Sequence, residues 1–148
     1  MKFKISITIL LSVFTFSIFS HEIDIKDKAV EEIVKMRMNN MSAINTLSKK
    51  LYKDLNSENL DLLNDHLKKI KKNVLEFKNL FPQGSEGGKS KELIWSENEL
   101  FNEYIANFLI DINAMIEDIE NKDLLFLKDN FNKMSSNCGK CHKKFKSR

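Results

Sequence analysis

Residues 138–142 read Cys-Gly-Lys-Cys-His and lie near the end of a segment whose apolar residues recur at helical spacing. Two thiols three positions apart lie about one turn apart on the same face of a helix. Such a pair can add to the two vinyl groups along one edge of a haem, and the imidazole of His142 can then reach the iron. The stretch therefore predicts a covalent c-type haem attachment site on the last helix.

Cys138 and Cys141 are the only cysteines of the chain, and other uses of such a pair are less well supported. A disulfide would close a very small loop and would leave the adjacent His142 unexplained. A thioredoxin-like pair follows a strand, whereas no βαβ pattern precedes this one. A zinc site needs two further ligands, and His21 and His66 are isolated residues. Haem attachment accounts for all three side chains of the motif.

Residues 1–20 begin with two nearby lysines and continue with an apolar run that ends near Ser20. A charged start and a short apolar core fit a secretory signal peptide better than a membrane anchor, which needs about 20 apolar residues. An uncleaved anchor is the alternative. We therefore expect export to the periplasm, with residues 21–148 as a single mature domain and no membrane span after cleavage.

The composition favours an all-α protein. The chain has four glycines and one proline, and no run of residues resembles a strand. Loss of the signal peptide would remove Lys2 and Lys4 and lower the formal net charge of +3 by two. The charge balance therefore gives no reason to expect nucleic-acid binding.

Apolar residues step by three and four in four segments, at about 25–55, 58–80, 96–121 and 123–146. This spacing places each set on one stripe of a helix facing a common core. The breaks are short except for residues 81–88, and short breaks favour antiparallel neighbours. We predict an antiparallel four-helix bundle in which the last helix holds the haem.

Finer features of the helices follow from the same pattern. The first stripe includes Val30, and the last begins at Leu124. Ser96 and Glu99 have the spacing of a capping box, which places a helix start at Ser96. His66 lies off the apolar stripe of its segment, so we expect its side chain to be exposed.

Arg37 and Met41 are distinctive members of the first stripe. A buried arginine needs an anionic partner, and a haem propionate is an obvious one. Met41 lies one turn further along on the same side. It could bind the iron opposite His142, or it could be a flexible side chain that fills the core.

Three parts of the chain together resemble the cytochrome c′ family, over nearly all of residues 21–148. The first is Ile33-Val34-Lys35-Met36-Arg37 with Met41, and the second is Phe81–Gly88 leading to Ile94-Trp95-Ser96 and Phe101. The third is Cys138 to Phe145 at the C-terminal end, whereas ordinary small cytochromes c carry their attachment motif near the N-terminus.

The resemblance implies a role for each site residue. Cys138 and Cys141 would hold one haem c by thioethers, with His142 as the proximal iron ligand. Arg37 would lie near a propionate. Met41 falls at the distal position, where low-spin members of the family have a methionine ligand and five-coordinate members usually have an apolar side chain.

The chain also departs from the family pattern. Met38 follows the arginine where the family often has glutamine, and Lys89 replaces an acidic residue that lies near the haem in some relatives. We assign both positions to the haem pocket. Lys146 stands where a basic residue near the proximal face is commonly arginine, and lysine lacks the forked donor geometry of arginine. This change weakens the case for nitric oxide handling.

The expected function is one-electron transfer by a periplasmic c-type cytochrome. The alternative is a five-coordinate haem protein that binds nitric oxide or carbon monoxide. No motif places a nucleophile beside a base or two carboxylates together, so we do not predict an enzyme. The basic residues among 140–148 are either a solvated helix end or a rim that attracts a redox partner with an acidic docking surface. Homodimers, frequent in the family, are a further expectation.

Overall fold

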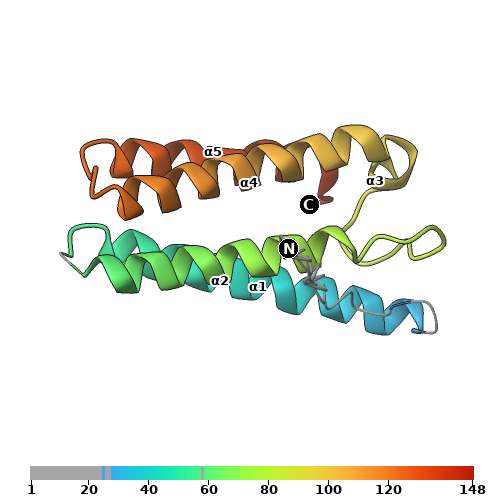
Figure 1. Ribbon diagram of the computed structural model, residues 1–148. Coiled ribbons are helices and arrows are strands. Elements are labelled where there is room, and N and C mark those ends of the chain that lie inside the picture. Colours follow the sequence, from blue (N-terminus) through green and yellow to red (C-terminus); the bar gives the residue numbers. More distant parts are fainter. Residues whose placement is uncertain (1–24, 26–27, 58) are drawn as a thin grey trace, which may run out of the picture.

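The computed structural model describes residues 25, 28–57 and 59–148, and in this part of the chain it contains five helices and no strand (Figure 1). The predicted signal peptide, residues 1–20, lies outside the described residues. The helices are α1 (Val30–Asp54), α2 (Leu60–Lys78), α3 (Leu93–Ser96), α4 (Asn98–Glu120) and α5 (Leu127–Phe145). The predicted all-α fold with four long helices is confirmed.

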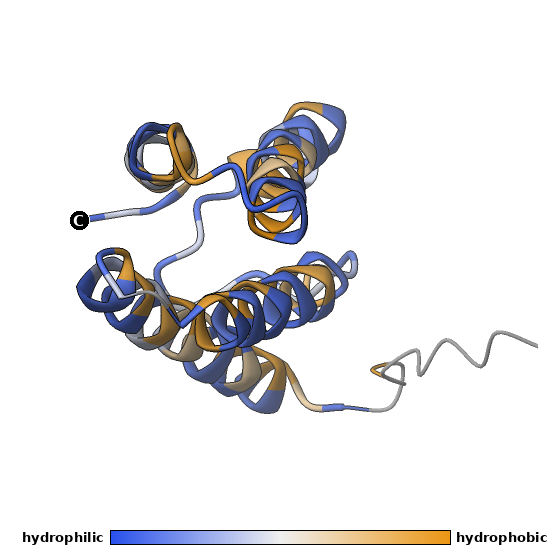
Figure 2. Ribbon diagram, turned by 60° about the vertical axis from the view of Figure 1, so that its left-hand side comes forward, coloured by the Kyte–Doolittle hydropathy of each residue, from blue (hydrophilic) through white to orange (hydrophobic). Residues whose placement is uncertain are grey.

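The long helices form two hairpins, α1 with α2 and α4 with α5, which pack against each other through α2 and α4 (Figures 1 and 2). Within the described residues, α1 and α5 make little close backbone contact with each other. The rings of Tyr52 on α1 and Phe131 on α5 are in contact near the α1–α2 and α4–α5 turns, with centroids 5.4 Å apart. The α1–α5 side is therefore closed by side chains at that end of the bundle.

The core is built from the predicted apolar stripes. Apolar colours face the space between the hairpins in Figure 2. Each fully buried aliphatic side chain contributes about 1.5–3 kcal/mol relative to an exposed one. Side chains with 0% exposure come from α1, α2 and α4: Leu51, Leu63, Leu67, Ile70, Ile112 and Met115. No helix in the described part of the chain is long and apolar enough to cross a membrane.

Two predicted helix starts were wrong. The last long helix begins at Leu127, because Lys122 has a left-handed backbone (φ 57°) and the Asp123 carboxylate accepts a hydrogen bond from the N–H of Leu125. Leu124 is consequently 42% exposed and lies outside the core. The first helix begins at Val30, later than about residue 25, and Val30 is 37% exposed.

The predicted capping box at Ser96 was also wrong. Ser96 ends the short helix α3, and its hydroxyl donates to the carbonyl of Glu92 within that turn. Glu97 then interrupts the helix with non-helical dihedrals (φ −116°, ψ 48°), and α4 begins at Asn98 without a side-chain cap.

His66 is buried, contrary to the prediction that it is exposed. Its side chain lies on α2 between the buried residues Leu63 and Leu67, and the residue is 7% exposed. Nε2 lies 3.0 Å from Oδ2 of Asp54, at the end of α1. The carboxylate that accounts for this burial is on another helix, and the pattern of α2 alone does not reveal it.

Truncation of the core on α2 should cost far more stability than truncation at its surface. We expect Leu67→Ala to lower the free energy of unfolding by about 2–5 kcal/mol, because it removes fully buried methyl groups and leaves a cavity. Leu75, on the same helix and 45% exposed, supplies the control. Urea denaturation followed by circular dichroism measures both variants, and equal losses for Leu67→Ala and Leu75→Ala would contradict the assigned core.

Candidate haem-binding site

Cys138 and Cys141 lie on the side of α5 that packs against the core. Both are free thiols and half-buried. Burial raises the pKa of both, and it raises the pKa of Cys141 to about 11, with Cys138 as a smaller cause. The two thiols are therefore protonated at neutral pH, which distinguishes them from redox-active pairs with a lowered pKa.

His142 follows in the last turn of α5 and is exposed. Partial desolvation lowers the pKa of its imidazole, and the nearby Lys146 cation lowers it further. The neutral imidazole, which is the form that binds a metal, is thus favoured at pH 7. Its backbone carbonyl accepts a hydrogen bond of 3.1 Å from the N–H of Lys146, which closes the helix.

Arg37 is the most deeply buried cation of the site, at 4% exposure. Its Nε donates to the carbonyl of Leu80 at 2.6 Å, and Nη2 donates to the carbonyl of Ser85 at 2.8 Å and to the Ser85 hydroxyl. The guanidinium also lies over the ring of Phe81, 4.4 Å from its centroid. Burial lowers the pKa of Arg37 to about 10, against the attraction of Glu86, so the side chain stays cationic at neutral pH.

These bonds fix the loop between α2 and α3 on the surface of α1. Ser85, 2% exposed, also donates from its hydroxyl to the carbonyl of Pro82 at 2.7 Å, and Trp95 Nε1 donates to the same carbonyl at 2.9 Å. Gly88 has φ +67°, and a Cβ there would lie 2.9 Å from a methyl group of Val34. Sequence reasoning recognised this loop but missed Ser85 as its anchor, because nothing in the sequence pairs a serine with an arginine 48 residues away.

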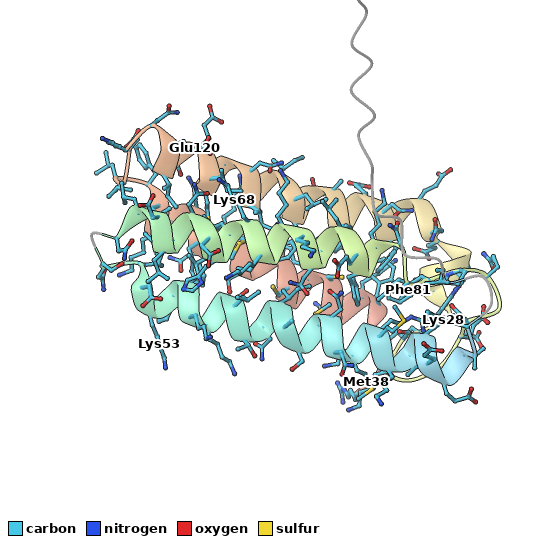
Figure 3. The ribbon with its side chains drawn as sticks, turned by 60° about the horizontal axis from the view of Figure 1, so that its bottom comes forward. Lys28, Met38, Lys53, Lys68, Phe81 and Glu120 are labelled. Carbon is cyan, nitrogen blue, oxygen red and sulfur yellow. The ribbon has the colours of Figure 1, made fainter. Side chains whose placement is uncertain are left out.

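The other predicted pocket residues lie in different surroundings. Met41, one turn after Arg37 on α1, is half-buried and packs against the core. Met38 is 67% exposed, at the outer edge of α1 and away from Phe81 (Figure 3). Lys89 is exposed, and its carbonyl accepts from the N–H of Ser147 at 2.9 Å.

The residues present fit a haem. The first and last long helices, which make little close backbone contact with each other, carry Met41 and the two thiols, and all three side chains pack against the core. Arg37 Nη1 is buried and has no hydrogen-bond partner among the described residues. A buried N–H group of this kind is costly unless an acceptor reaches it, and a propionate carboxylate is such an acceptor.

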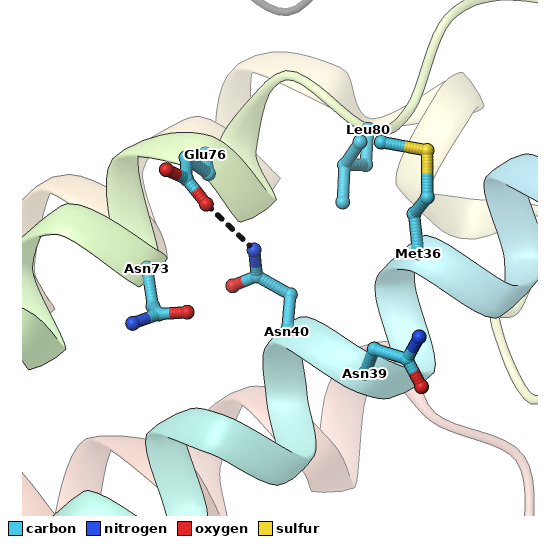
Figure 4. Close-up of a pocket in the computed structure, with 6 residues that line it drawn as sticks. All are labelled: Met36, Asn39, Asn40, Asn73, Glu76 and Leu80. Carbon is cyan, nitrogen blue, oxygen red and sulfur yellow. Dashed lines mark hydrogen bonds between the residues drawn. The ribbon is translucent and has the colours of Figure 1, made fainter.

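Two open hollows lie elsewhere on the surface. One of about 270 Å³, between α1 and α2, is lined by Met36, Asn39, Asn40, Asn73, Glu76 and Leu80 (Figure 4). Within it, Asn40 Nδ2 donates to Glu76 Oε2 at 3.3 Å. The other, of about 380 Å³, lies between α4 and α5 beside Tyr104 and Asp111. Neither is lined by a cysteine, by His142 or by Met41.

Comparison with known proteins supports the fold and the family. The family model for cytochrome c′ matches residues 32–146. A solved cytochrome c′ superposes with a TM-score of 0.76 at 19% identity, over 81% of this chain and 98% of its own. The cytochrome c′ from Thermochromatium tepidum gives a TM-score of 0.72 at 16% identity, over 82% and 99% of the two chains.

A third similar structure is a nitric oxide complex of a mutant cytochrome c prime from Alcaligenes xylosoxidans. It has a TM-score of 0.74 at 19% identity, over 80% of this chain and 96% of its own. At these identities the structural matches establish the fold alone. Comparison with curated proteins finds no match.

Four long helices with a Cys-x-x-Cys-His sequence at the end of the last one define a haem-binding helical bundle. The family model spans most of the chain, and the protein belongs to the cytochrome c′ family. Proteins of this family bind a covalent c-type haem.

Loss of the Ser85 hydroxyl should loosen the loop that Arg37 holds. We expect Ser85→Ala to lower the free energy of unfolding by about 1–3 kcal/mol, because a buried charged donor loses one acceptor. Ser96→Ala, at an exposed serine, is the control. Urea denaturation of each variant makes the comparison. Two similarly small effects would mean that the Ser85 carbonyl and Leu80 alone hold the guanidinium.

Proposed function

We propose that the protein is a periplasmic one-electron carrier with one haem held covalently by Cys138 and Cys141. His142 is the proximal ligand and Met41 the distal ligand. The observation that carries the proposal is the placement of Met41, half-buried against the core one turn from Arg37, whose Nη1 is buried and unpaired among the described residues. When bound, the haem supplies the Fe(III)/Fe(II) couple.

The residues of the chain have distinct tasks in this function. A thioether ligand favours ferrous iron, and an apolar surrounding raises the reduction potential in the same direction. Arg37, fixed by the loop, offers its free N–H to a propionate and offsets that negative charge. The lowered pKa of His142 keeps the lone pair of its imidazole available for the iron. With both axial positions filled, no iron site is open to a substrate, so we propose no enzymatic activity.

The second candidate is a five-coordinate haem protein that binds small gases. Two structures similar to this chain are of variants of cytochrome c prime from Alcaligenes xylosoxidans, one a nitric oxide complex and the other with carbon monoxide bound. If the methionine at position 41 only fills the core, its apolar surface would border an open iron site suited to uncharged diatomic molecules. The two candidates differ in the bond between Met41 and iron.

We further propose that the partner is a redox protein with an acidic docking surface. Two segments distant in sequence meet at the haem-bearing end, because Ser90 forms an isolated antiparallel bridge with Lys146. Lys91 Nζ donates to the carbonyls of Lys143 and Lys144 at 3.3 and 3.2 Å, near the end of α5. The exposed cations gathered there, here called the basic end surface, are Lys89, Lys140, Lys143, Lys146 and Arg148.

Export and assembly complete the proposal. The signal peptide at residues 1–20 directs the chain to the periplasm, where c-type haem is attached. A homodimer through α1 is proposed from the family resemblance, and sedimentation of the holoprotein measures it.

Met41→Ala should change the absorption spectrum of the holoprotein from low-spin to high-spin. We expect loss of a methionine–iron charge-transfer band, a high-spin spectrum and a new response to carbon monoxide. Met36→Ala, at another half-buried methionine of α1, should leave all three unchanged. Absorption spectra of both oxidation states, with and without the gas, provide the measurement. A wild-type protein that is already high-spin and binds carbon monoxide would overturn methionine ligation and favour the second candidate.

Charge reversal on the basic end surface should alter electron transfer according to the charge of the oxidant. At low ionic strength we expect the Lys89→Glu/Lys143→Glu variant to be oxidised by hexacyanoferrate(III) about tenfold more slowly. Oxidation by a cationic cobalt(III) complex should become faster. Stopped-flow mixing measures both rates, and both effects should disappear as the salt concentration rises, because salt screens the surface charges. If Lys49→Glu/Lys50→Glu, on α1, changes the rates as much, the basic end surface is not the docking site.

A further inference from the structure

Two aspartate–asparagine pairs join α4 to α5. Asn137 Nδ2 donates to Asp111 Oδ2, and Asn130 Nδ2 donates to Asp118 Oδ2 at 2.6 Å. The aspartates lie seven residues apart on α4, and the asparagines lie seven residues apart on α5 in the opposite order. The same interaction therefore recurs after about two turns in one antiparallel register.

The two pairs differ in burial and in their distance from the haem motif. The side chain of Asp111 is only 5% exposed, and its Oδ1 lies 3.3 Å from Nζ of Lys133, which is 69% exposed. Asn137 immediately precedes Cys138. Asp118 is half-buried and lies near the turn between α4 and α5. The Asp111–Asn137 pair thus adjoins the haem attachment sequence. The Asp118–Asn130 pair, which has the same chemistry further away, can serve as its control.

We propose that Asp111 is a positioning residue for the haem attachment sequence, and that its buried negative charge lowers the reduction potential of the iron. The proposal rests on the function proposed above, in which Cys138 and Cys141 hold the haem.

The positioning role follows from helix geometry. Successive residues of an α-helix are rotated by about 100° around its axis. The bond to Asp111 holds Asn137 on the flank of α5 that faces α4, and this orientation turns Cys138 and Cys141 towards the core, where both pack. Apolar contacts alone tolerate small rotations of a helix. A hydrogen bond to a carboxylate has a required direction, so it selects one rotation and one axial register.

The electrostatic role follows from burial. The carboxylate of Asp111 is largely removed from water, and the charge of its partner Lys133 is solvated at the surface. A negative charge in a poorly screened position stabilises ferric over ferrous iron. Neutralising Asp111 should therefore raise the potential, whereas neutralising Lys133 should lower it. If Asp111 only helped the helices to pack, the two substitutions would not shift the reduction potential in opposite directions.

The test compares Asp111→Asn, Asp111→Leu and Lys133→Met with Asp118→Asn and Asp118→Leu, all as holoproteins. The asparagine at position 111 is isosteric and can still accept from Asn137, so it removes the charge and keeps the geometry. Spectroelectrochemical titration gives the midpoint potential, and the pyridine haemochrome assay gives the fraction of chains with covalent haem. Urea denaturation gives the stability.

We expect Asp111→Asn to shift the midpoint potential upwards with full haem attachment, and Lys133→Met to shift it downwards. Asp111→Leu should shift the potential upwards and also reduce the attached fraction. Asp118→Leu should lose stability because it removes the acceptor of Asn130, and both Asp118 variants should keep an unchanged potential and full attachment. Equal effects at positions 111 and 118, or an unchanged potential in Asp111→Asn, would overturn the proposal. A wild-type protein without haem would instead refute the proposed function, and this inference with it.

Discussion

The burial of one guanidinium orders the end of the bundle where the site lies. Arg37 has left water, and its charge can be tolerated only because carbonyl and hydroxyl groups replace the lost hydration. Those acceptors belong to Leu80 and Ser85, so the end of α2 and the loop after it must adopt one conformation on α1. The same constraint places the ring of Phe81 against the cation. The hydrogen bond from Trp95 to the carbonyl of Pro82 then fixes α3 on this loop.

The two ends of the bundle consequently have different chemistry. Towards the α1–α2 and α4–α5 turns, the helices meet through aliphatic residues such as Leu51 and Leu63, and the polar pair of His66 with Asp54 lies at the edge of this packing. Towards the other end, polar atoms enter the interior at Arg37 and Ser85, and the half-buried thiols lie on α5. Apolar packing supplies stability throughout. The buried cation of Arg37 and its acceptors lie at the end where a cofactor with both apolar and anionic parts would need them.

The sequence was informative where a feature depends on spacing along one helix. The period of the apolar residues predicted four long helices, and the placement of Arg37 and Met41 on one stripe identified the inner side of α1. Features that depend on a partner distant in the sequence could not be predicted in this way. His66 is buried because Asp54 reaches it from another helix, and Asp111 is buried because Asn137 and Lys133 lie across from it on α5. The start of α5 depends on the left-handed backbone at Lys122, a position where the sequence has no glycine.

The predicted ligands lie at opposite ends of the chain, and this arrangement constrains how the site can form. Met41 is on the first helix and His142 on the last, whereas the close backbone packing runs from α1 through α2 and α4 to α5. Each hairpin can form its own contacts locally, but α1 with Met41 and α5 with the thiols are brought into one bundle only when α2 packs on α4. A group attached to α5 and liganded from α1 would bind the docked hairpins more tightly than the separated ones. Its binding energy would therefore add to the stability of the packing between the two hairpins.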